Sequence, residues 1–305
     1  MDKPAILLLA HGTPDTIEEV PAYLRNVTSG RNLPDTVVKE IQHRYSLIGR
    51  SPLTEITLQQ ARLVREISGL PTYVGMRNWK PYTHETVAQM VRDGVTHAVA
   101  ICLTPHNSRT SVGLYRRAVV GETGQAPFTV DFVPEWHDEP LLIEAFAEKL
   151  SVAWNQACSD AGTKVPVIFT AHSVPTRTIE GGDPYEAQTR ETAELVARRV
   201  PEIGEWKFCF QSQGMSGGVW IGPTVESAID AACAAGHKAV FLHAIGFVCD
   251  HVEILYDIDI AFKNYAATKG MKLFRAESLN ASPKFASAVV AVARARLQAA
   301  GAARK

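Results

Sequence analysis

The sequence has few cysteines, and those it has are scattered. Its 305 residues include five, at positions 102, 158, 209, 233 and 249, with no CxxC pair and an odd total. This spacing excludes a disulfide framework and a zinc knuckle. Cys102 and Cys209 fall in apolar, strand-like runs, so we expect both in the core.

Long apolar runs and an excess of one charge are also missing. No run reaches the roughly 18 to 20 residues that span a bilayer, and residues 5–10 are too short for the apolar core of a signal peptide. The 31 basic and 32 acidic residues, without long blocks of either sign, argue against nucleic-acid binding. We expect a cytoplasmic monomer. Whether residues 21–31 touch a membrane stays open.

What the chain does contain is a regular alternation of strand and helix patterns. Apolar runs predict strands at residues 5–10, 72–75, 98–103, 129–133, 165–170, 206–210 and 239–243. Helical patterns fall at residues 16–27, 51–67, 84–92, 140–157, 185–199, 224–235 and 283–299. Ser51 is the expected N-cap of the second helix, with Pro52 at its first position. This alternation predicts the α/β class with doubly wound parallel sheets.

The two halves of the chain resemble each other. ILLLAHGTP at residues 6–14 parallels VIFTAHSVP at residues 167–175. In each half a proline also stands thirteen residues before a glycine that leads into a strand: Pro81 before Gly94, and Pro223 before Gly236. We infer two similar lobes, residues 1–150 and 160–280, with residues 281–305 as a helix packing back on them.

The repeat places two histidines at corresponding strand ends. His11 and His172 each follow an Ala at the carboxyl end of a predicted strand, the edge where open α/β sheets bind ligands. We expect both to face a shared cleft. Chance similarity between two buried parallel strands is the alternative.

Two separated motifs carry a resemblance to a known family. The first is TAHSVP at residues 170–175, followed by an acidic residue and GDPY at residues 182–185. The second is GFVCDHVEILYD at residues 246–257, with QSQG at 211–214 and WIGP at 220–223 between them. These segments resemble the ferrochelatases, which insert ferrous iron into a porphyrin. The resemblance runs from about Ile6 to the C-terminal helix and implies a class II chelatase-like fold, in which two lobes flank a porphyrin cleft.

The resemblance implies which residues carry the chemistry. His172 matches the motif histidine and Glu253 the family carboxylate, which implies catalytic and metal-binding roles for both. A neutral imidazole can accept a pyrrole proton or bind a metal, and which task His172 performs stays open. If Asp250 caps a helix, Glu253 and Asp257 share one face and can guide a divalent cation; a solvated acidic face is the alternative. Ala261 stands where many relatives continue the acidic stripe.

Three further residues match family positions, and a fourth, His11, departs from one. His106 resembles a histidine near the route by which the metal enters, and His251 one that holds the helix start or orients a ligand. Trp220 is either an aromatic wall for the macrocycle or a core anchor. His11 stands where coproporphyrin-type relatives have a tyrosine that binds the product iron, so we expect it to be an axial ligand of that iron.

The region around Arg44 resembles the coproporphyrin-type enzymes more than the protoporphyrin type. Arg44, Tyr45 and Ser51 match residues that hold substrate propionates, for which arginine offers a planar fork. An exposed helix charge is the alternative for Arg44. Two residues depart from the pattern: Thr28 replaces a second propionate-binding arginine, and His137, which we also expect at the substrate, replaces a tyrosine.

The leading prediction is a ferrochelatase of haem biosynthesis that takes Fe2+ and coproporphyrin III as substrates. No cysteine follows Cys249, so we expect no iron–sulfur cluster of the kind that some ferrochelatases hold near the C-terminus, and no other tightly bound cofactor. A sirohydrochlorin or cobalt-type chelatase is the second hypothesis, because His-Gly-Thr at residues 11–13 follows the first strand. A non-catalytic haem or porphyrin carrier is the third.

Overall fold

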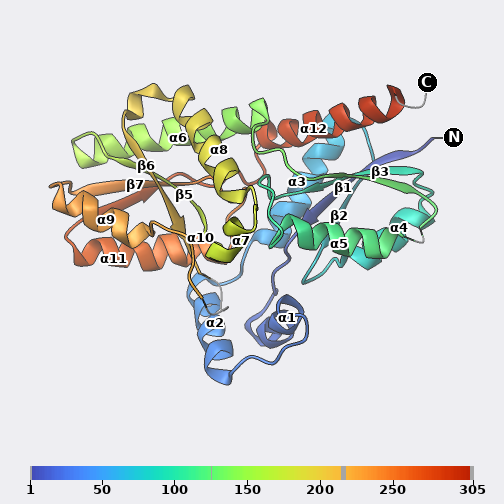
Figure 1. Ribbon diagram of the computed structural model, residues 1–305, viewed down its shortest axis with the longest axis horizontal. Helices are drawn as coiled ribbons and strands as arrows, with labels where there is room; N and C mark the ends of the chain where they lie inside the picture. The colour runs from blue at the N-terminus through green and yellow to red at the C-terminus, as the bar shows by residue number, and fades with distance from the viewer. Residues whose placement is uncertain (1, 125, 214–217, 303–305) are drawn as a thin grey trace. The chain divides into compact units, whose positions relative to one another are not determined.

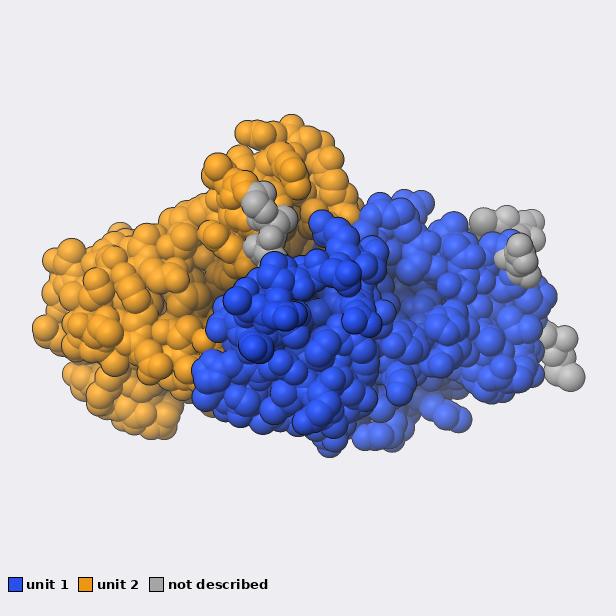
Figure 2. Space-filling view, turned by 90° about the horizontal axis from the view of Figure 1, so that it is seen from below, with its two compact units in different colours: residues 1–105, 111–136, 280–305 blue, residues 106–110, 137–279 orange. Residues whose placement is uncertain are grey.

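The chain folds into two compact units. The structure is a computed structural model that describes residues 2–124, 126–213 and 218–302. Unit 1 comprises residues 1–105, 111–136 and 280–305, and unit 2 comprises residues 106–110 and 137–279 (Figures 1 and 2). None of the helices within the described residues is both long and apolar enough to cross a bilayer.

Unit 1 is built on a four-stranded parallel sheet. Its strands are β1 (Pro4–Ala10), β2 (Thr72–Met76), β3 (His97–Cys102) and β4 (Thr129–Val133), in the order β2-β1-β3-β4. Helices α3 (Leu53–Ser68) and α12 (Pro283–Ala302) cover one face, and α4 (Thr83–Arg92) and α5 (Val112–Thr123) the other (Figure 1). The short helix η1 (Ile17–Glu19), α1 (Val20–Val27) and α2 (Asp35–Ile48) follow β1. Buried faces on both sides explain why β1 and β3 read as continuous apolar runs.

Unit 2 repeats this plan. Its strands are β5 (Val167–His172), β6 (Trp206–Gln211), β7 (Ala239–Ala244) and β8 (Lys272–Arg275), in the order β6-β5-β7-β8. Helices α6 (Pro140–Ala161) and α8 (Tyr185–Arg199) cover one face, and α9 (Val225–Ala234) and α11 (Lys263–Thr268) the other (Figure 1). The short helices are α7 (Thr176–Glu180), η2 (Pro201–Ile203), α10 (Val252–Leu255) and the π-helix η3 (Asp257–Phe262).

Matching contacts confirm that the two units are repeats. The amide of Met76 donates to the carbonyl of Pro81 at 2.7 Å, and the amide of Phe210 donates to that of Pro223 at 2.8 Å. In both units the next helix is ten residues long and is followed by a glycine with a positive φ, 70° at Gly94 and 85° at Gly236. The predicted pair of similar doubly wound lobes is therefore confirmed.

The boundary between the units differs from the predicted one near residues 150–160. It falls between residues 136 and 137, because α6 packs on α8, β7 and β8 and so belongs to unit 2. Residues 106–110 also belong to unit 2, where the amide of Arg109 donates to the buried carboxylate of Asp183 at 2.7 Å. The C-terminal helix packs back on α3 and β3 within unit 1.

All seven predicted strands are found within two residues of their expected ends, but several short or polar elements were not predicted. These are β8, α2, α5, α7 and α11. Strand β8 has four residues, of which Lys272 is exposed and Leu273 alone is buried, so no alternating pattern could develop. The predicted N-cap Ser51 is wrong by one residue: Pro52 occupies the cap position of α3, and Ser51 is buried before it.

Candidate active site

His172 is the last residue of β5, and three backbone or side-chain contacts fix its position. Its Nδ1 donates to the carbonyl of Ser173, and its Nε2 lies 3.1 Å from Oε1 of Glu253. The hydroxyl of Tyr185 donates to the carbonyl of His172 at 2.9 Å. The imidazole is 26% exposed, so it is held firmly and still reachable.

The loop after β7 passes so close to β5 that only glycine fits at position 246. A Cβ there would lie 2.7 Å from the Cβ of Ala171. The next residue, Phe247, therefore comes beside His172, with ring centroids 6.3 Å apart, and its ring lies 4.7 Å from that of His251. An aromatic ring thus borders the imidazole on the side of β7.

Trp220 borders His172 from a second direction. Its ring centroid lies 6.3 Å from that of His172, and its backbone forms an isolated antiparallel bridge with Pro175. The hydroxyl of Ser173 donates to the carbonyl of Ile221 at 2.8 Å. The WIGP segment therefore braces the loop that follows β5, and Gly214 of the QSQG segment lies outside the described residues.

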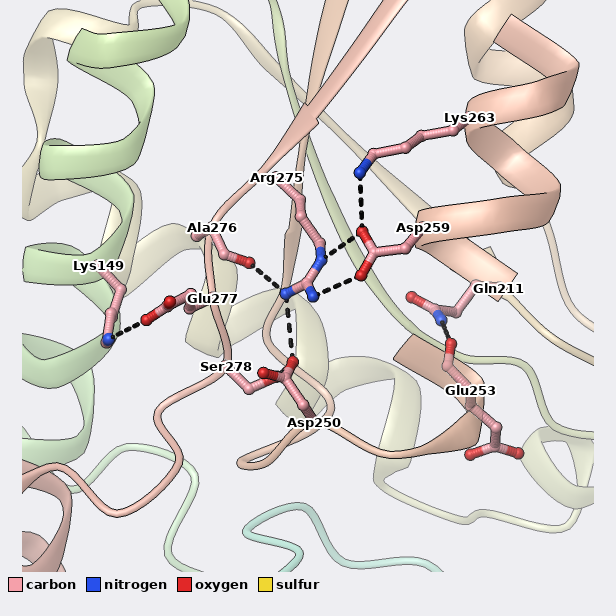
Figure 3. A network of polar contacts seen from close by, with 10 residues as sticks. All are labelled: Lys149, Gln211, Asp250, Glu253, Asp259, Lys263, Arg275, Ala276, Glu277 and Ser278. Carbon is pink, nitrogen blue, oxygen red and sulfur yellow. Dashed lines mark hydrogen bonds and ion pairs between the residues drawn. The ribbon is translucent and has the colours of Figure 1, made fainter. Parts of the chain in front are cut away.

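Glu253 links two histidines through its two carboxylate oxygens. Oε1 faces Nε2 of His172, and Oε2 lies 3.3 Å from Nε2 of His251. Its backbone carbonyl accepts from Nε2 of Gln211 at 3.0 Å (Figure 3), and Oε1 of that buried amide accepts from Thr170 at 2.8 Å. His172 on β5 and Glu253 on α10 are thus connected by their side-chain contact and also through Gln211 on β6 and Thr170 on β5. The expected roles of His251, at the helix start and orienting a ligand, both fit this geometry.

The hydrogen-bond partners of His172 require a protonated ring. Both ring nitrogens face oxygen acceptors, so both carry hydrogen. Burial lowers the pKa of His172, but the charge and hydrogen bond of Glu253, the Ser173 carbonyl and the charge of Asp257 outweigh it and raise the pKa to about 9. Burial raises the pKa of Glu253, but His172 and His251 hold it well below its ordinary value. The resting site is an ion pair, and the ring must lose a proton before it can bind a metal or accept a proton.

Within the described part of the chain, no group of three or more His, Cys, Asp or Glu side chains is arranged to hold a metal ion. His172 and Glu253 instead satisfy each other. The carboxylate of Asp257 accepts a short hydrogen bond from the hydroxyl of Ser212. A cation could therefore be held by Glu253, Asp257 and His172 only after the ion pair opens.

Asp250 does not cap the helix that carries Glu253. His251 occupies the cap position of α10, and Asp250 instead accepts from Arg275 at 3.2 Å and from Ser278 at 2.9 Å (Figure 3). Asp250 is held by the charged guanidinium of Arg275 and by Ser278, and the carbonyl of His251 accepts the first amides of the helix, those of Ile254 and Leu255. Ala261 lies inside the π-helix, where its amide donates to the carbonyl of Tyr256 at 2.9 Å.

His106 and His137 are buried together, with ring centroids 6.1 Å apart. Nε2 of His106 lies 2.9 Å from the hydroxyl of Thr192, and burial, with the charge of His137, lowers the pKa of His106 to about 3. Nε2 of His137 lies 3.0 Å from Oε2 of Glu191. The ring of His106 also packs edge-on against Tyr185, whose hydroxyl donates to the carbonyl of His172. Tyr185 therefore connects the two buried histidines to His172.

In unit 1, His11 follows β1 at a turn that also needs glycine. Gly12 has φ 85°, and a Cβ on it would lie 2.7 Å from the backbone nitrogen of Trp79. The amide nitrogen of the Asn78 side chain lies 3.2 and 3.1 Å from the two ring nitrogens of His11, and the ring of Tyr23 packs edge-on against it.

The residues expected to hold propionates lie in unit 1 as well. Arg44 forms a surface pair with Glu40 at 3.1 Å, and the buried hydroxyl of Tyr45 lies 3.0 Å from that of Thr13, two residues after His11. Ser51 is 2% exposed, and its hydroxyl has no hydrogen-bond partner among the described residues. Thr28, in place of an arginine, caps the end of α1 by donating to the carbonyl of Leu24 at 2.8 Å.

Several residues that shape the site had no role assigned from the sequence: Asn78, Asp183, Tyr185, Gln211, Ser212 and Arg275. Tyr185 and Asp183 lie inside the GDPY motif, and Asp183 accepts from the amide of Tyr185 at 3.2 Å. The motif itself was therefore the available signal for these two. Arg275 lies outside the motifs named above, so the sequence around it gave no signal of a role at the site.

Comparison with known proteins gives a consistent family match. Residues 3–297 match the family model described as Ferrochelatase. A ferrochelatase of Acidobacterium capsulatum is 52% identical, covering 98% of this chain and 97% of its own length. A coproporphyrin III ferrochelatase of Geobacillus sp. is 32% identical, covering 97% and 98%. Among solved structures, the sirohydrochlorin chelatase SirB from Bacillus subtilis subspecies spizizenii in complex with cobalt has a TM-score of 0.57 at 11% identity, covering 96% of this chain and 94% of its own. At that identity the likeness concerns the fold alone.

Proposed function

The chain belongs to the ferrochelatase family, whose members are metal-chelating lyases, and we propose that it inserts Fe2+ into coproporphyrin III in the cytoplasm. The observation that carries the chemistry is the contact between His172 and Glu253. The choice of porphyrin is supported by Arg44, Tyr45 and Ser51 and by the likeness to coproporphyrin III ferrochelatases over nearly the whole chain. No resident cofactor is part of the proposal, since iron enters as substrate.

Insertion exchanges two pyrrole protons for one Fe2+, so the site must take up protons and pass on a cation. Glu253 and Asp257 supply the negative charge that attracts Fe2+. His172 first releases its extra proton to solvent and then accepts a proton from a pyrrole nitrogen or binds the incoming metal, and each pyrrole proton that it does not take up passes to solvent. Phe247 and Trp220 border the imidazole, and we assign them the role of walls against which the macrocycle lies.

We assign propionate binding to Arg44 and Ser51. The pair of Arg44 with Glu40 is partly exposed, and such pairs contribute little stability, so a propionate can replace the glutamate. The buried hydroxyl of Ser51 has a hydrogen to donate. His106 and His137, held by Thr192 and Glu191, support Tyr185 behind His172 instead of binding substrate in this scheme.

Steady-state insertion of Fe2+ and of Co2+ into coproporphyrin III, protoporphyrin IX and sirohydrochlorin tests the proposal. We expect the highest kcat/KM for Fe2+ with coproporphyrin III. Preference for sirohydrochlorin would establish the second hypothesis. Insertion no faster than the uncatalysed reaction, with tight product binding, would establish a carrier.

A variant pair links that preference to a residue. Arg44→Gln should raise the KM for coproporphyrin III several-fold without changing that for Fe2+, because it removes a charged partner of a propionate. Arg198→Gln is the matched control, since Arg198 forms the same i,i+4 pair with Glu194 on α8. Equal KM values for the two variants would remove Arg44 from the binding site.

His11 is proposed as an axial ligand of the product iron. A ligating imidazole uses its lone pair on the metal and donates its other N–H to a neighbour. Asn78 supplies that acceptor through Oδ1 once its side-chain amide turns over, which exchanges the oxygen with the nitrogen now near the ring. We expect wild type and His11→Ala, each titrated with ferric coproporphyrin, to differ in absorption and electron paramagnetic resonance spectra.

The control for this titration is His237→Ala, because His237 is exposed after α9 in unit 2. Its spectra should match those of wild type. If His11→Ala also matches wild type, His11 does not bind the iron, and the expectation that it faces the porphyrin loses its main support.

A further inference from the structure

Arg275 ends strand β8 with its guanidinium between two carboxylates (Figure 3). Nε and Nη2 donate to the two oxygens of Asp259 at 2.8 and 2.6 Å. Nη1 donates to Oδ1 of Asp250 at 3.2 Å and to the carbonyl of Ala276 at 3.1 Å. The side chain is 15% exposed, so this is a largely buried fork and not a surface pair.

The two carboxylates flank the segment that carries the reactive acids. Asp250 precedes His251 and Glu253, and Asp259 follows Asp257 in the π-helix. One guanidinium therefore ties both ends of residues 250–259 to the sheet. Glu253 lies between these two ends in the sequence, and Figure 3 shows its backbone carbonyl held separately by Gln211.

The backbone of this segment is irregular. Helix α10 has four residues and continues through Tyr256 into the six-residue π-helix, which runs directly into α11. π-helices are rare and are found frequently at functional sites. Because the π-helix departs from regular α-helical hydrogen bonding between Glu253 and α11, contacts from the rest of unit 2 help to set the arrangement of Glu253 and Asp257.

The neighbouring contacts reinforce Arg275 but do not replace it. Ser278 donates to Asp250 at 2.9 Å, and Lys263 lies 3.2 Å from Asp259. Each reaches only one of the two carboxylates. Without the guanidinium, two mostly buried acids would lie near each other with weaker partners and would separate or take up water.

We infer that Arg275 is a positioning residue for iron delivery: by clamping Asp250 and Asp259 it fixes Glu253 and Asp257 in the arrangement that receives Fe2+. The inference rests on the proposed function. It predicts that loss of the clamp weakens the use of iron far more than the use of porphyrin, because no group that contacts Arg275 comes from the proposed propionate site.

The test compares Arg275→Met and Arg275→Lys with wild type in steady-state iron insertion. Residues that support metal ligands typically contribute about 10- to 100-fold to metal affinity, so Arg275→Met should raise the KM for Fe2+ by about that factor. The KM for coproporphyrin III should stay within about twofold of wild type. Arg275→Lys keeps the charge but loses the planar fork, so its KM for Fe2+ should lie between the two.

Arg296→Met is the matched control, because Arg296 forms a similar fork with Asp131 in unit 1, at 3.1 and 2.7 Å. It should leave the KM for Fe2+ unchanged. Thermal unfolding of each variant separates misfolding from mispositioning. If Arg275→Met does not fold, Asp259→Asn and Arg275→Lys carry the comparison.

The outcomes separate the inference from the function on which it rests. If wild type inserts no iron, the proposed function fails. Suppose that wild type is active and that the folded variants either keep the wild-type KM for Fe2+ or show equal rises in the KM for Fe2+ and the KM for coproporphyrin III. In either case Arg275 has only a structural role, and the inference is overturned.

Discussion

Replacement of His172 by alanine should lower kcat for iron insertion by about 10²- to 10⁴-fold, the range that a positioned acid or base contributes. The fold should persist, because the imidazole lies at a strand end and is partly exposed. Initial rates at saturating Fe2+ and coproporphyrin III measure the effect, and circular dichroism checks the fold. A variant that keeps more than about a tenth of wild-type kcat would remove His172 from the chemistry.

The pH dependence gives the same prediction an independent readout. The pKa of His172 is raised to about 9 by Glu253, so at neutral pH the ring is charged and cannot accept a proton. The wild-type kcat/KM should therefore rise with pH and level off above about 9. His172→Ala should lack this rise, whereas the surface control His237→Ala should keep it. The raised pKa also means that the ion pair stabilises the fold fully below the unfolded value of 6.5 and loses its effect as pH passes 9.

The sequence was sufficient for the central strands β1, β3, β5 and β7 because they are buried on both faces. Runs such as residues 5–10 and 239–242 are apolar throughout, which leaves little choice of structure. The repeat then placed His11 and His172 at equivalent strand ends. Strand β8 was not predicted: it has only four residues, with Lys272 and Arg275 at its ends, and it pairs with β7 alone.

The partners within the site were harder to predict, because they come from distant segments. The family motifs identified both His172 and Glu253. They did not reveal that the imidazole of His172 is protonated, because this depends on the acceptors that face its two ring nitrogens. The shared face of Glu253 and Asp257 was predicted on the condition that Asp250 caps a helix, a position that suits aspartate. The actual partner of Asp250, Arg275, lies on the strand that was not predicted. The tertiary ion pair of Asp250 with Arg275 therefore outweighs the local preference of aspartate for a helix N-cap.

Glu253→Gln should lower kcat/KM for Fe2+ by about 10²-fold or more, within the range for a group that takes part in proton transfer. The amide keeps the shape of the side chain but removes the charge that attracts Fe2+ and pairs with His172. Porphyrin should still bind, since the proposed propionate contacts lie in unit 1. Rates over a range of Fe2+ concentrations, with porphyrin binding followed by fluorescence quenching, measure the two effects separately.

The same substitution should shift the pH profile in a definite direction. With the carboxylate charge gone, burial still lowers the pKa of His172, so the ring should lose its proton at lower pH than in wild type. The residual activity should then level off below pH 9. Glu194→Gln is the control, because it removes the charge of a carboxylate that pairs with Arg198 on α8, outside the proposed iron site. If Glu253→Gln kept wild-type turnover at saturating Fe2+ and an unshifted profile, Glu253 would neither guide the cation nor set the charge of His172, and its contact with that ring would serve the fold alone.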